Sequence, residues 1–250
     1  MYTLKKSLGQ HFLKDDAVCQ RIVSALSEMP FSRLLEVGPG GGALTRYLLE
    51  LSGIDFKAVE LDEEKIQYLL KTYPAITGKI IHDSILETTI PFEGQFTVIG
   101  NFPYNISSQI LFRILEWSDN VEGAIGMFQK EVATRIAAGP NNKDYGILSV
   151  LVQAFFTVEY LFDVEENSFT PPPKVKSGVI RMVNSHNPWQ ITNKKKFFHL
   201  VKTAFGQRRK QLRNPLKSMF DSETLKESLF TKRAENLDVN DYVNLMNRMK

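Results

Sequence analysis

The sequence contains a single cysteine, Cys19, and only four histidines, which are scattered along its 250 residues. One cysteine excludes an intramolecular disulfide, as is usual in a reducing cytoplasm. Cys19 has no partners at metal-ligand spacing, so we expect no metal site. No apolar run approaches the ~20 residues of a membrane span, and the basic N-terminus lacks the apolar stretch of a secretory signal. We therefore expect a soluble, cytoplasmic protein with no membrane partner.

Acidic residues are absent from one long stretch. Between Glu166 and Asp221 there is no Asp or Glu, whereas twelve Lys and Arg occur there. Residues 1–184 carry 17 Lys and Arg against 22 Asp and Glu, and residues 185–250 carry 14 against 6. Solvated helices usually mix both signs, so the basic part indicates binding to a polyanion. A solvated, lysine-rich surface is the alternative.

The composition, 43% apolar and 24% charged, is that of a globular protein. Short apolar runs alternate with helical patterns in the first part, and this alternation predicts an α/β fold with a parallel sheet covered by helices on both faces. The expected strands are 34–37, 56–59, 79–81, 96–99 and 124–128, followed by later, antiparallel strands at 158–164 and 179–183. After Asn184 the pattern becomes helical, with expected helices at 194–205, 213–220, 224–230 and 239–249. We therefore place a domain boundary between residues 184 and 185.

A glycine-rich turn, E-V-G-P-G-G-G-A-L-T at 36–45, follows the first expected strand. Gly38 and Gly40 let backbone amides approach a ligand at a helix N-terminus, although a tight structural turn is the alternative. Glu60, followed by Leu61, lies 22 residues after Gly38, close to the ~20-residue offset of a carboxylate that binds ribose hydroxyls.

Glu36 lies inside this turn, where its charge would repel a pyrophosphate and attract an ammonium and a sulfonium. S-adenosylmethionine carries both cations, so we predict it as the cofactor, with NAD as the second candidate. Asp83 and Ser84 end another expected strand, where ligands gather in open α/β sheets, and they fit contact with an adenine. For Asp83 a helix or turn cap is an equally good interpretation.

The segment N-F-P-Y-N-I-S at 101–107 carries the predicted chemistry. Asn101 offers an amide carbonyl, Phe102 precedes Pro103 and so exposes its backbone carbonyl, and Tyr104 supplies a flat ring. Two acceptors and a stacking ring suit the exocyclic amine of adenine, whose lone pair must leave the ring plane before it attacks a methyl group. In-line displacement then needs positioning and desolvation more than a strong base. An Asn-x-Pro turn with a core tyrosine is the structural alternative.

A stacked base cannot reach such a pocket, so the target must lie in a loop or be flipped out. Flipping a base out costs the free energy of unstacking it. Basic side chains that bind the backbone on either side of the base would offset this cost. We predict that role for Lys174, which follows three prolines, and for Arg208, Arg209, Lys210 and Arg213. Phe169 and the prolines have two interpretations: they form a wall beside the pocket, or they are a loop that only spaces other elements.

The chain resembles the bacterial small-subunit (16S) ribosomal RNA adenine dimethyltransferase family nearly from end to end. The segments that carry the resemblance are L-G-Q-H-F-L at 8–13, E-V-G-P-G-G-G-A-L-T at 36–45, V-E-L-D at 59–62, N-F-P-Y-N-I-S at 101–107, M-F-Q-K-E-V at 127–132, A-G-P at 138–140, Y-G-I-L-S-V at 145–150, F-T-P-P-P-K-V at 169–175, Q-R-R-K-Q-L-R-N at 207–214 and R-A-E-N-L at 233–237.

The resemblance implies dimethylation by S-adenosylmethionine of two adjacent adenosines in a 3′-terminal hairpin loop of small-subunit RNA, within an immature 30S particle. It implies a Rossmann-like catalytic domain over 1–184 and a basic, helical RNA-binding domain over 185–250. The implied cofactor contacts are His11, Leu13, Gly38, Glu60, Asp83 and Asn101, and the implied adenine pocket is Asn101, Phe102, Pro103 and Tyr104. Leu is commoner than Phe at position 102, a change that we expect to affect packing but not the carbonyl.

Other functions stay open at this point. Relatives that methylate large-subunit RNA and confer antibiotic resistance share an N-x-P-Y-N motif, whereas DNA adenine methyltransferases typically show N/D-P-P-Y. A largely non-catalytic assembly factor and a non-enzymatic relative in transcription belong to other classes. Nothing in the sequence indicates an obligate dimer, and we expect a monomer.

Overall fold

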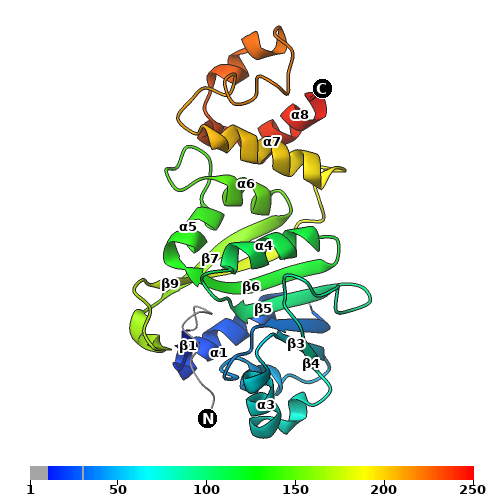
Figure 1. Ribbon diagram of the computed structural model, residues 1–250, viewed down its shortest axis with the longest axis vertical. Helices are drawn as coiled ribbons and strands as arrows, with labels where there is room; N and C mark the ends of the chain where they lie inside the picture. Colours follow the sequence, from blue (N-terminus) through cyan, green and yellow to red (C-terminus); the bar gives the residue numbers. More distant parts are fainter. Residues whose placement is uncertain (1–10, 30) are drawn as a thin grey trace. The chain divides into compact units, whose positions relative to one another are not determined.

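A seven-stranded sheet forms the centre of the computed structural model, which describes residues 11–29 and 31–250. Its strand order is β4-β3-β2-β5-β6-β9-β7 (Figure 1). The strands β2 to β6 pair in parallel, and β9 is antiparallel to β6, so the α/β prediction is confirmed. The bounds are β2 Arg33–Val37, β3 Asp55–Glu60, β4 Ile80–His82, β5 Phe96–Asn101, β6 Val121–Gln129, β7 Phe156–Val164 and β9 Ser177–Asn184.

The central strands are buried on both faces, which explains why they read as continuous apolar runs. Leu34 and Leu35 on β2 and Val98 and Ile99 on β5 are at most 1% exposed. In the register, Glu36 pairs with Ala58 on β3 and with Ile99 on β5. The carboxyl ends of β2, β3 and β5 therefore lie at one edge of the sheet.

Helices connect the strands, and several begin at the acidic residues that favour a helix N-terminus. Asp15 caps α1 by accepting from Val18 N (3.2 Å), and Asp62 caps α3 by accepting from Glu64 N (3.1 Å). α3 packs beside β3 and β4 (Figure 1). The α-helices are α1 Asp16–Ser24, α2 Thr45–Leu48, α3 Glu63–Thr72, α4 Ser107–Glu116, α5 Lys130–Ala137, α6 Ile147–Gln153, α7 Lys194–Gly206 and α8 Val239–Arg248. The 3-10 turns are η2 Ala25–Glu28, η3 Pro74–Ile76, η4 Glu166–Ser168, η5 Thr224–Lys226, η6 Ser228–Thr231 and η7 Ala234–Asn236.

A second, two-stranded sheet joins distant parts of the chain. β1 (Phe12–Leu13) pairs antiparallel with β8 (Phe169–Thr170), so Phe12 faces Thr170 and Leu13 faces Phe169. The backbone N–H of Lys14 extends this pairing by donating to the carbonyl of Ser168 (2.9 Å). The segment before α1 is thereby tied to the loop before β9.

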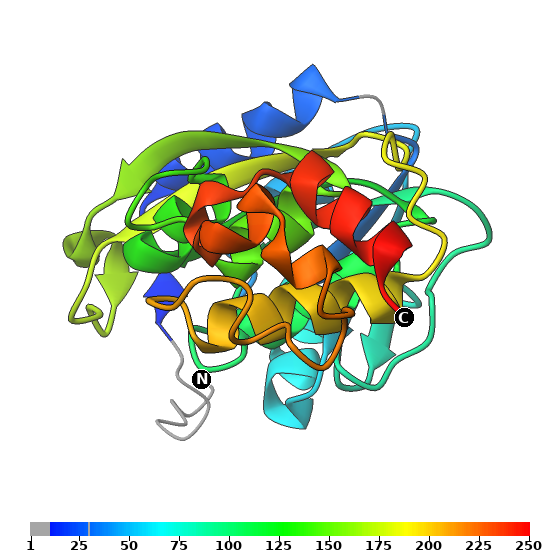
Figure 2. The same cartoon turned by 90° about the horizontal axis from the view of Figure 1, so that it is seen from above.

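The chain divides into two compact units, and one of the points where it passes from one unit to the other lies after Asn184. The first unit contains the chain up to Ala133 and Glu159–Asn184, and the second contains Thr134–Val158 and Ser185–Lys250. The segment Thr134–Val158, which we had expected in the first domain, falls in the second unit because α6 packs against α7. α7 and α8 lie side by side within that unit (Figure 2).

Two expected helices of the second unit are absent. Residues 213–220 form successive turns, with Leu216 N donating to Leu212 O (3.1 Å) and Met219 N to Leu216 O (2.9 Å). Pro215 explains this difference, because proline has no N–H and disfavours a helical residue before it. Residues 224–230 form the 3-10 turns η5 and η6, which the extended backbone of Glu227 (ψ 150°) separates. None of the helices in the described ranges is long and apolar enough to cross a membrane.

Candidate active site

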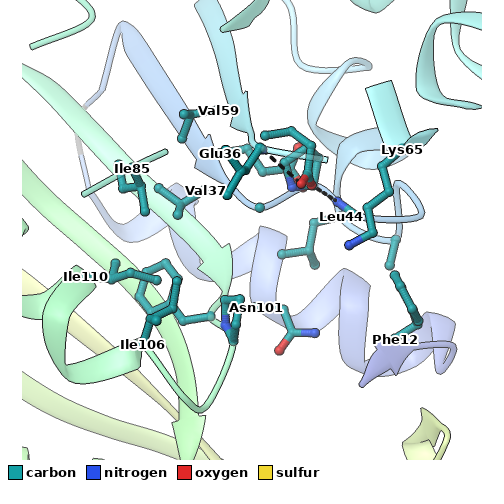
Figure 3. A pocket seen from close by; sticks show the side chains of 18 of the residues that line it. Phe12, Glu36, Val37, Leu44, Val59, Lys65, Ile85, Asn101, Ile106 and Ile110 are labelled. Atoms are coloured by element: carbon teal, nitrogen blue, oxygen red, sulfur yellow. Dashed lines mark hydrogen bonds between the residues drawn. The ribbon is translucent and has the colours of Figure 1, made fainter. Parts of the chain in front are cut away.

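A cavity of about 270 Å³ lies at the sheet edge where β2, β3 and β5 end. Apolar side chains such as Val37, Val59 and Ile85 form much of its wall, with Asn101 and Glu36 among the polar groups (Figure 3). Of the predicted cofactor and catalytic residues, the structure brings together His11, Leu13, Glu36, Gly38, Gly40, Glu60, Leu61, Ser84, Asn101, Phe102, Pro103 and Tyr104.

The glycine turn contributes backbone to the cavity and requires glycine at two positions. Gly38 and Gly40 have φ of 67° and 57°, in the left-handed region that glycine adopts readily. A Cβ at Gly40 would lie 3.2 Å from the Phe12 ring. The Gly40 N–H donates to Glu60 Oε2 (3.1 Å), which joins the turn to the end of β3.

Glu60 has one acceptor position that no hydrogen bond from another described residue occupies. Its Oε1 accepts from the backbone N–H of Leu61 and of Asp62, at 3.0 Å each. Its Oε2 accepts only the Gly40 N–H among the hydrogen bonds of the described residues, and a carboxylate oxygen has two lone pairs. The remaining lone pair of Oε2 can therefore accept a hydrogen bond from a ligand. Leu61 beside it is 58% exposed.

Glu36 is 2% exposed and accepts a hydrogen bond from Thr45 Oγ1 (2.7 Å). Burial raises the pKa of Glu36 to about 8, the neighbouring charge of Glu60 adds to this, and the Thr45 hydrogen bond opposes it. At pH 7 the carboxyl therefore carries its proton in the free protein. A cation bound beside Glu36 would lower this pKa and favour the negative charge that the sequence predicts at this position.

Asn101 ends β5, and its side-chain Nδ2 donates to the main-chain carbonyl of His11 (3.2 Å). That contact identifies the nitrogen end of the amide and leaves Oδ1 as an acceptor. Tyr104 forms a hydrogen bond between its hydroxyl and Ser177 Oγ (2.5 Å). Burial raises the pKa of the Tyr104 phenol, so the hydroxyl stays protonated at neutral pH.

Phe102 is 1% exposed, and its ring packs edge-on against Phe128 with centroids 5.2 Å apart. A Cβ at Gly100 would lie 2.6 Å from the Phe102 ring, and one at Gly126 would lie 2.5 Å from it. These two glycines make room for an aromatic side chain under the pocket. The side chain at position 102 therefore takes part in core packing.

Asp83, unlike Ser84, does not line the cavity. Its Oδ1 accepts from the backbone N–H of Ser84 (2.7 Å), and the Ser84 hydroxyl accepts from Leu86 N (3.2 Å). These contacts fit the turn-cap interpretation of Asp83, and its predicted contact with the cofactor stays a prediction.

Among the side chains of the site that sequence reasoning missed, two are polar and buried. Lys65 on α3 lines the cavity, is 4% exposed, and extends toward Phe12, with its Nζ 5.3 Å from the ring centroid (Figure 3). Ser177 on β9 is fully buried and holds Tyr104. An ordinary amphipathic helix and a strand-initial serine carry no signal that would have identified either residue.

The predicted RNA-binding residues differ in how they are held. Arg209, Lys210 and Arg213 are exposed in the turns after α7, and Lys174 is exposed between β8 and β9. Arg208 is half-buried, and its Nη2 donates to the carbonyls of Lys143 (2.7 Å) and Asn142 (3.4 Å). Its Nε lies 3.7 Å from Glu235 Oε2. Arg208 thus ties parts of the second unit together.

Comparison with known proteins shows which family shares this arrangement. The model of the ribosomal RNA adenine dimethylase family matches residues 1–250. The chain belongs to this family. This rRNA adenine dimethylase is a methyltransferase, as its sequence predicted. Among the residues that the structure describes, no group of three or more His, Cys, Asp or Glu is placed to hold a metal ion.

The dimethylase is similar over nearly its whole length to curated proteins named ribosomal RNA small subunit methyltransferase A. The protein from Flavobacterium johnsoniae is 49% identical over 250 residues, covering 98% of this chain and 95% of the relative. The protein from Cytophaga hutchinsonii is 46% identical over 249 residues, covering 98% and 96%.

Solved structures show the same fold. A dimethyladenosine transferase from Plasmodium falciparum superposes with a TM-score of 0.79 at 24% identity, over 96% of this chain and 99% of that chain. The 23S rRNA methyltransferase ErmE superposes with a TM-score of 0.72 at 22% identity, over 95% and 99%.

Proposed function

We propose that this dimethylase transfers methyl groups from S-adenosylmethionine to the exocyclic amines of two adjacent adenosines in a 3′-terminal hairpin loop of small-subunit ribosomal RNA. The substrate is the RNA within an immature small subunit, the protein acts as a cytoplasmic monomer, and methylation is coupled to subunit maturation. The name of the relatives from Flavobacterium and Cytophaga supports the small subunit as the substrate.

The pocket suits the proposed cofactor. The left-handed glycines expose backbone at the turn, and Glu60 Oε2 keeps one acceptor position of the kind that a ribose hydroxyl needs. Glu36 supplies a carboxyl that ionises beside a cation, and Leu61 and Ser84 offer contacts for a flat base. S-adenosylmethionine, when bound, supplies an electrophilic methyl group on a sulfonium.

The orientation of the Asn101 amide is the observation that carries the proposal for catalysis. Because Nδ2 donates to His11, Oδ1 can accept a hydrogen bond from the amine of a target adenine. We infer that the Phe102 carbonyl is the second acceptor and that the Tyr104 ring stacks on the base. Two acceptors hold the amine hydrogens out of the ring plane and direct the nitrogen lone pair toward the methyl group. After transfer the amine nitrogen is positively charged and loses its proton to water.

The first experiment offers radiolabelled S-adenosylmethionine and the protein to immature small subunits, large-subunit RNA and duplex DNA, and maps the labelled base. Dimethylated adjacent adenosines in the small subunit alone support the proposal. Label in large-subunit RNA would reassign the substrate. Tight binding to small subunits without any label would indicate an assembly factor.

Asn101→Ala tests the catalytic role. We expect methyl transfer to fall at least ~100-fold, because positioning supplies most of the rate enhancement, while cofactor and RNA affinity change little. Asn120→Ala, at an asparagine outside the lining of the cavity, is the matched control. Near-wild-type turnover of Asn101→Ala would rule out the proposed pocket.

A further inference from the structure

His11 connects three segments of the first unit that are far apart in the sequence. Its main-chain carbonyl accepts from Asn101 Nδ2 (3.2 Å), and its ring Nδ1 lies 2.8 Å from the carbonyl oxygen of Pro171. Its ring also lies against Tyr104, with centroids 5.5 Å apart and planes tilted by 33°. One residue therefore contacts the proposed acceptor, the proposed stacking ring and the proline loop.

The chemistry of the Pro171 contact determines the state of the His11 ring. A carbonyl oxygen only accepts, so Nδ1 must carry the hydrogen. The His11 ring therefore donates through Nδ1 to the Pro171 carbonyl.

The loop that receives this hydrogen bond is itself held firmly. Phe12 and Leu13 pair with Thr170 and Phe169, so the chain on each side of the His11–Pro171 contact belongs to the small β1–β8 sheet. Phe169 is 1% exposed and forms part of the core. Because the loop is anchored in the core, the His11 ring is fixed relative to the sheet edge.

Tyr104 is held at two points. Its hydroxyl is bonded to Ser177 Oγ, and Ser177 is fully buried at the start of β9. Its ring rests against the imidazole of His11. A ring fixed at its hydroxyl alone can still swing about that end, and the imidazole restricts this movement.

We propose that His11 is a positioning residue for methyl transfer: its Nδ1–H bond to Pro171 holds the segment whose carbonyl orients Asn101 and whose ring supports Tyr104. This inference rests on the proposed function, and it goes beyond the cofactor contact that the family resemblance implies for His11. Without the His11–Pro171 hydrogen bond, Asn101 and the Tyr104 ring would shift together. This shift would slow methyl transfer and leave cofactor binding in place.

A matched pair of substitutions tests this role. The Nδ2 of asparagine occupies nearly the position of the histidine Nδ1, whereas the Nε2 of glutamine corresponds to the histidine Nε2. His11→Asn therefore keeps a donor for Pro171, and His11→Gln moves the donor away. His11→Ala removes both the donor and the ring.

We expect His11→Ala to lower kcat at least ~10-fold, with KM for RNA and the cofactor Kd within ~2-fold of wild type. His11→Asn should recover most of the lost kcat, and His11→Gln should stay near the alanine variant. Thermal unfolding of all three variants shows whether they fold. If the His11→Ala variant does not fold, the kcat values of His11→Asn and His11→Gln still test the positioning role.

Two results would overturn the inference while the proposed function stands. One is equal kcat for His11→Asn and His11→Gln in an active enzyme. The other is a loss of cofactor affinity in His11→Ala that accounts for the whole loss of activity, since this would make His11 a cofactor contact only. A wild-type protein that methylates no RNA would instead overturn the proposed function, and this inference with it.

Discussion

At the scale of single residues, the buried acid Glu36 gives the site a dependence on pH. A carboxyl whose pKa is higher in the folded protein than in the unfolded chain binds more protons when folded. Its ordinary pKa is 4.5, and in the folded protein the value is about 8. The folded state therefore loses stability relative to the unfolded state as pH rises from about 4.5 to about 8, and the loss ends above that range.

Glu36→Gln tests this dependence, because glutamine keeps an oxygen for the Thr45 hydroxyl and does not titrate. We expect the free energy of unfolding of Glu36→Gln minus that of wild type to increase by up to ~1.4 kcal/mol per pH unit between pH 4.5 and 8. Urea unfolding at several pH values measures the difference. Glu50→Gln, at an exposed glutamate, is the control for loss of a charge. A constant difference across this range would show that Glu36 is ionised throughout.

The sequence predicted 12 of the 25 residues that line the cavity, because the signals of those 12 are local. A glycine turn, a strand-end acid and the N-F-P-Y segment each lie within a few residues, and parallel strands place their carboxyl ends together. Lys65 and Ser177 were missed because their roles depend on contacts with distant segments. The contact of Pro171 with His11 also depends on distant segments, because it follows from the pairing of β1 with β8.

At the scale of elements, Gly100 on β5 and Gly126 on β6 lie against the ring of Phe102, which directly follows β5. Phe102 occupies space that a side chain at Gly126 would enter, since a Cβ there would lie 2.5 Å from the Phe102 ring and 2.6 Å from the Phe128 ring. Close-packed cores accommodate such an addition only by strain. The phenylalanine at position 102 and the glycine at position 126 are therefore coupled.

We expect Gly126→Ala to destabilise the protein by ~1–3 kcal/mol through overpacking. Phe102→Leu removes ring atoms near that site, so the double variant should be less destabilised than the sum of the two single variants. Chemical denaturation of the four proteins measures this coupling. Gly139→Ala is the control, because a Cβ there meets nothing within 4 Å. If the two changes in unfolding free energy are additive, the Phe102 ring moves away from the added Cβ without an energetic cost.

The sequence predicted helices correctly where apolar residues recur at helical spacing. It was wrong at 213–220, where a proline interrupts that spacing. The helix expected at 239–249 agrees with α8 (Val239–Arg248), because its apolar positions and its Asp238 cap agree. The apolar spacing at 213–220 also suggested a helix, yet Pro215 leaves only turns there. After the glycine turn, α2 covers only Thr45–Leu48, since Gly42 (φ 83°) keeps the preceding backbone in a turn.

At the scale of the whole molecule, the opposite net charges of the two parts of the sequence are the main feature that the fold leaves unexplained. Within the basic part, Arg208 serves structure by holding the carbonyls of Asn142 and Lys143 and by facing Glu235. Arg209, Lys210 and Arg213 are exposed. Exposed cations without acids among them favour phosphate. Their attraction weakens as the salt concentration rises, because the release of condensed counterions then gains less free energy.

Replacing Arg209, Lys210 and Arg213 together by alanine should weaken binding to small-subunit RNA. We expect the slope of log K against log salt to become shallower by ~2, since each lost phosphate contact on single-stranded RNA removes ~0.7. Filter binding from low to moderate salt measures the slope. Arg208→Ala is the matched control, because its loss should lower stability by about 1 kcal/mol and leave the slope nearly unchanged. An unchanged slope in the triple variant would identify this basic segment as a solvated surface and move the RNA contacts elsewhere.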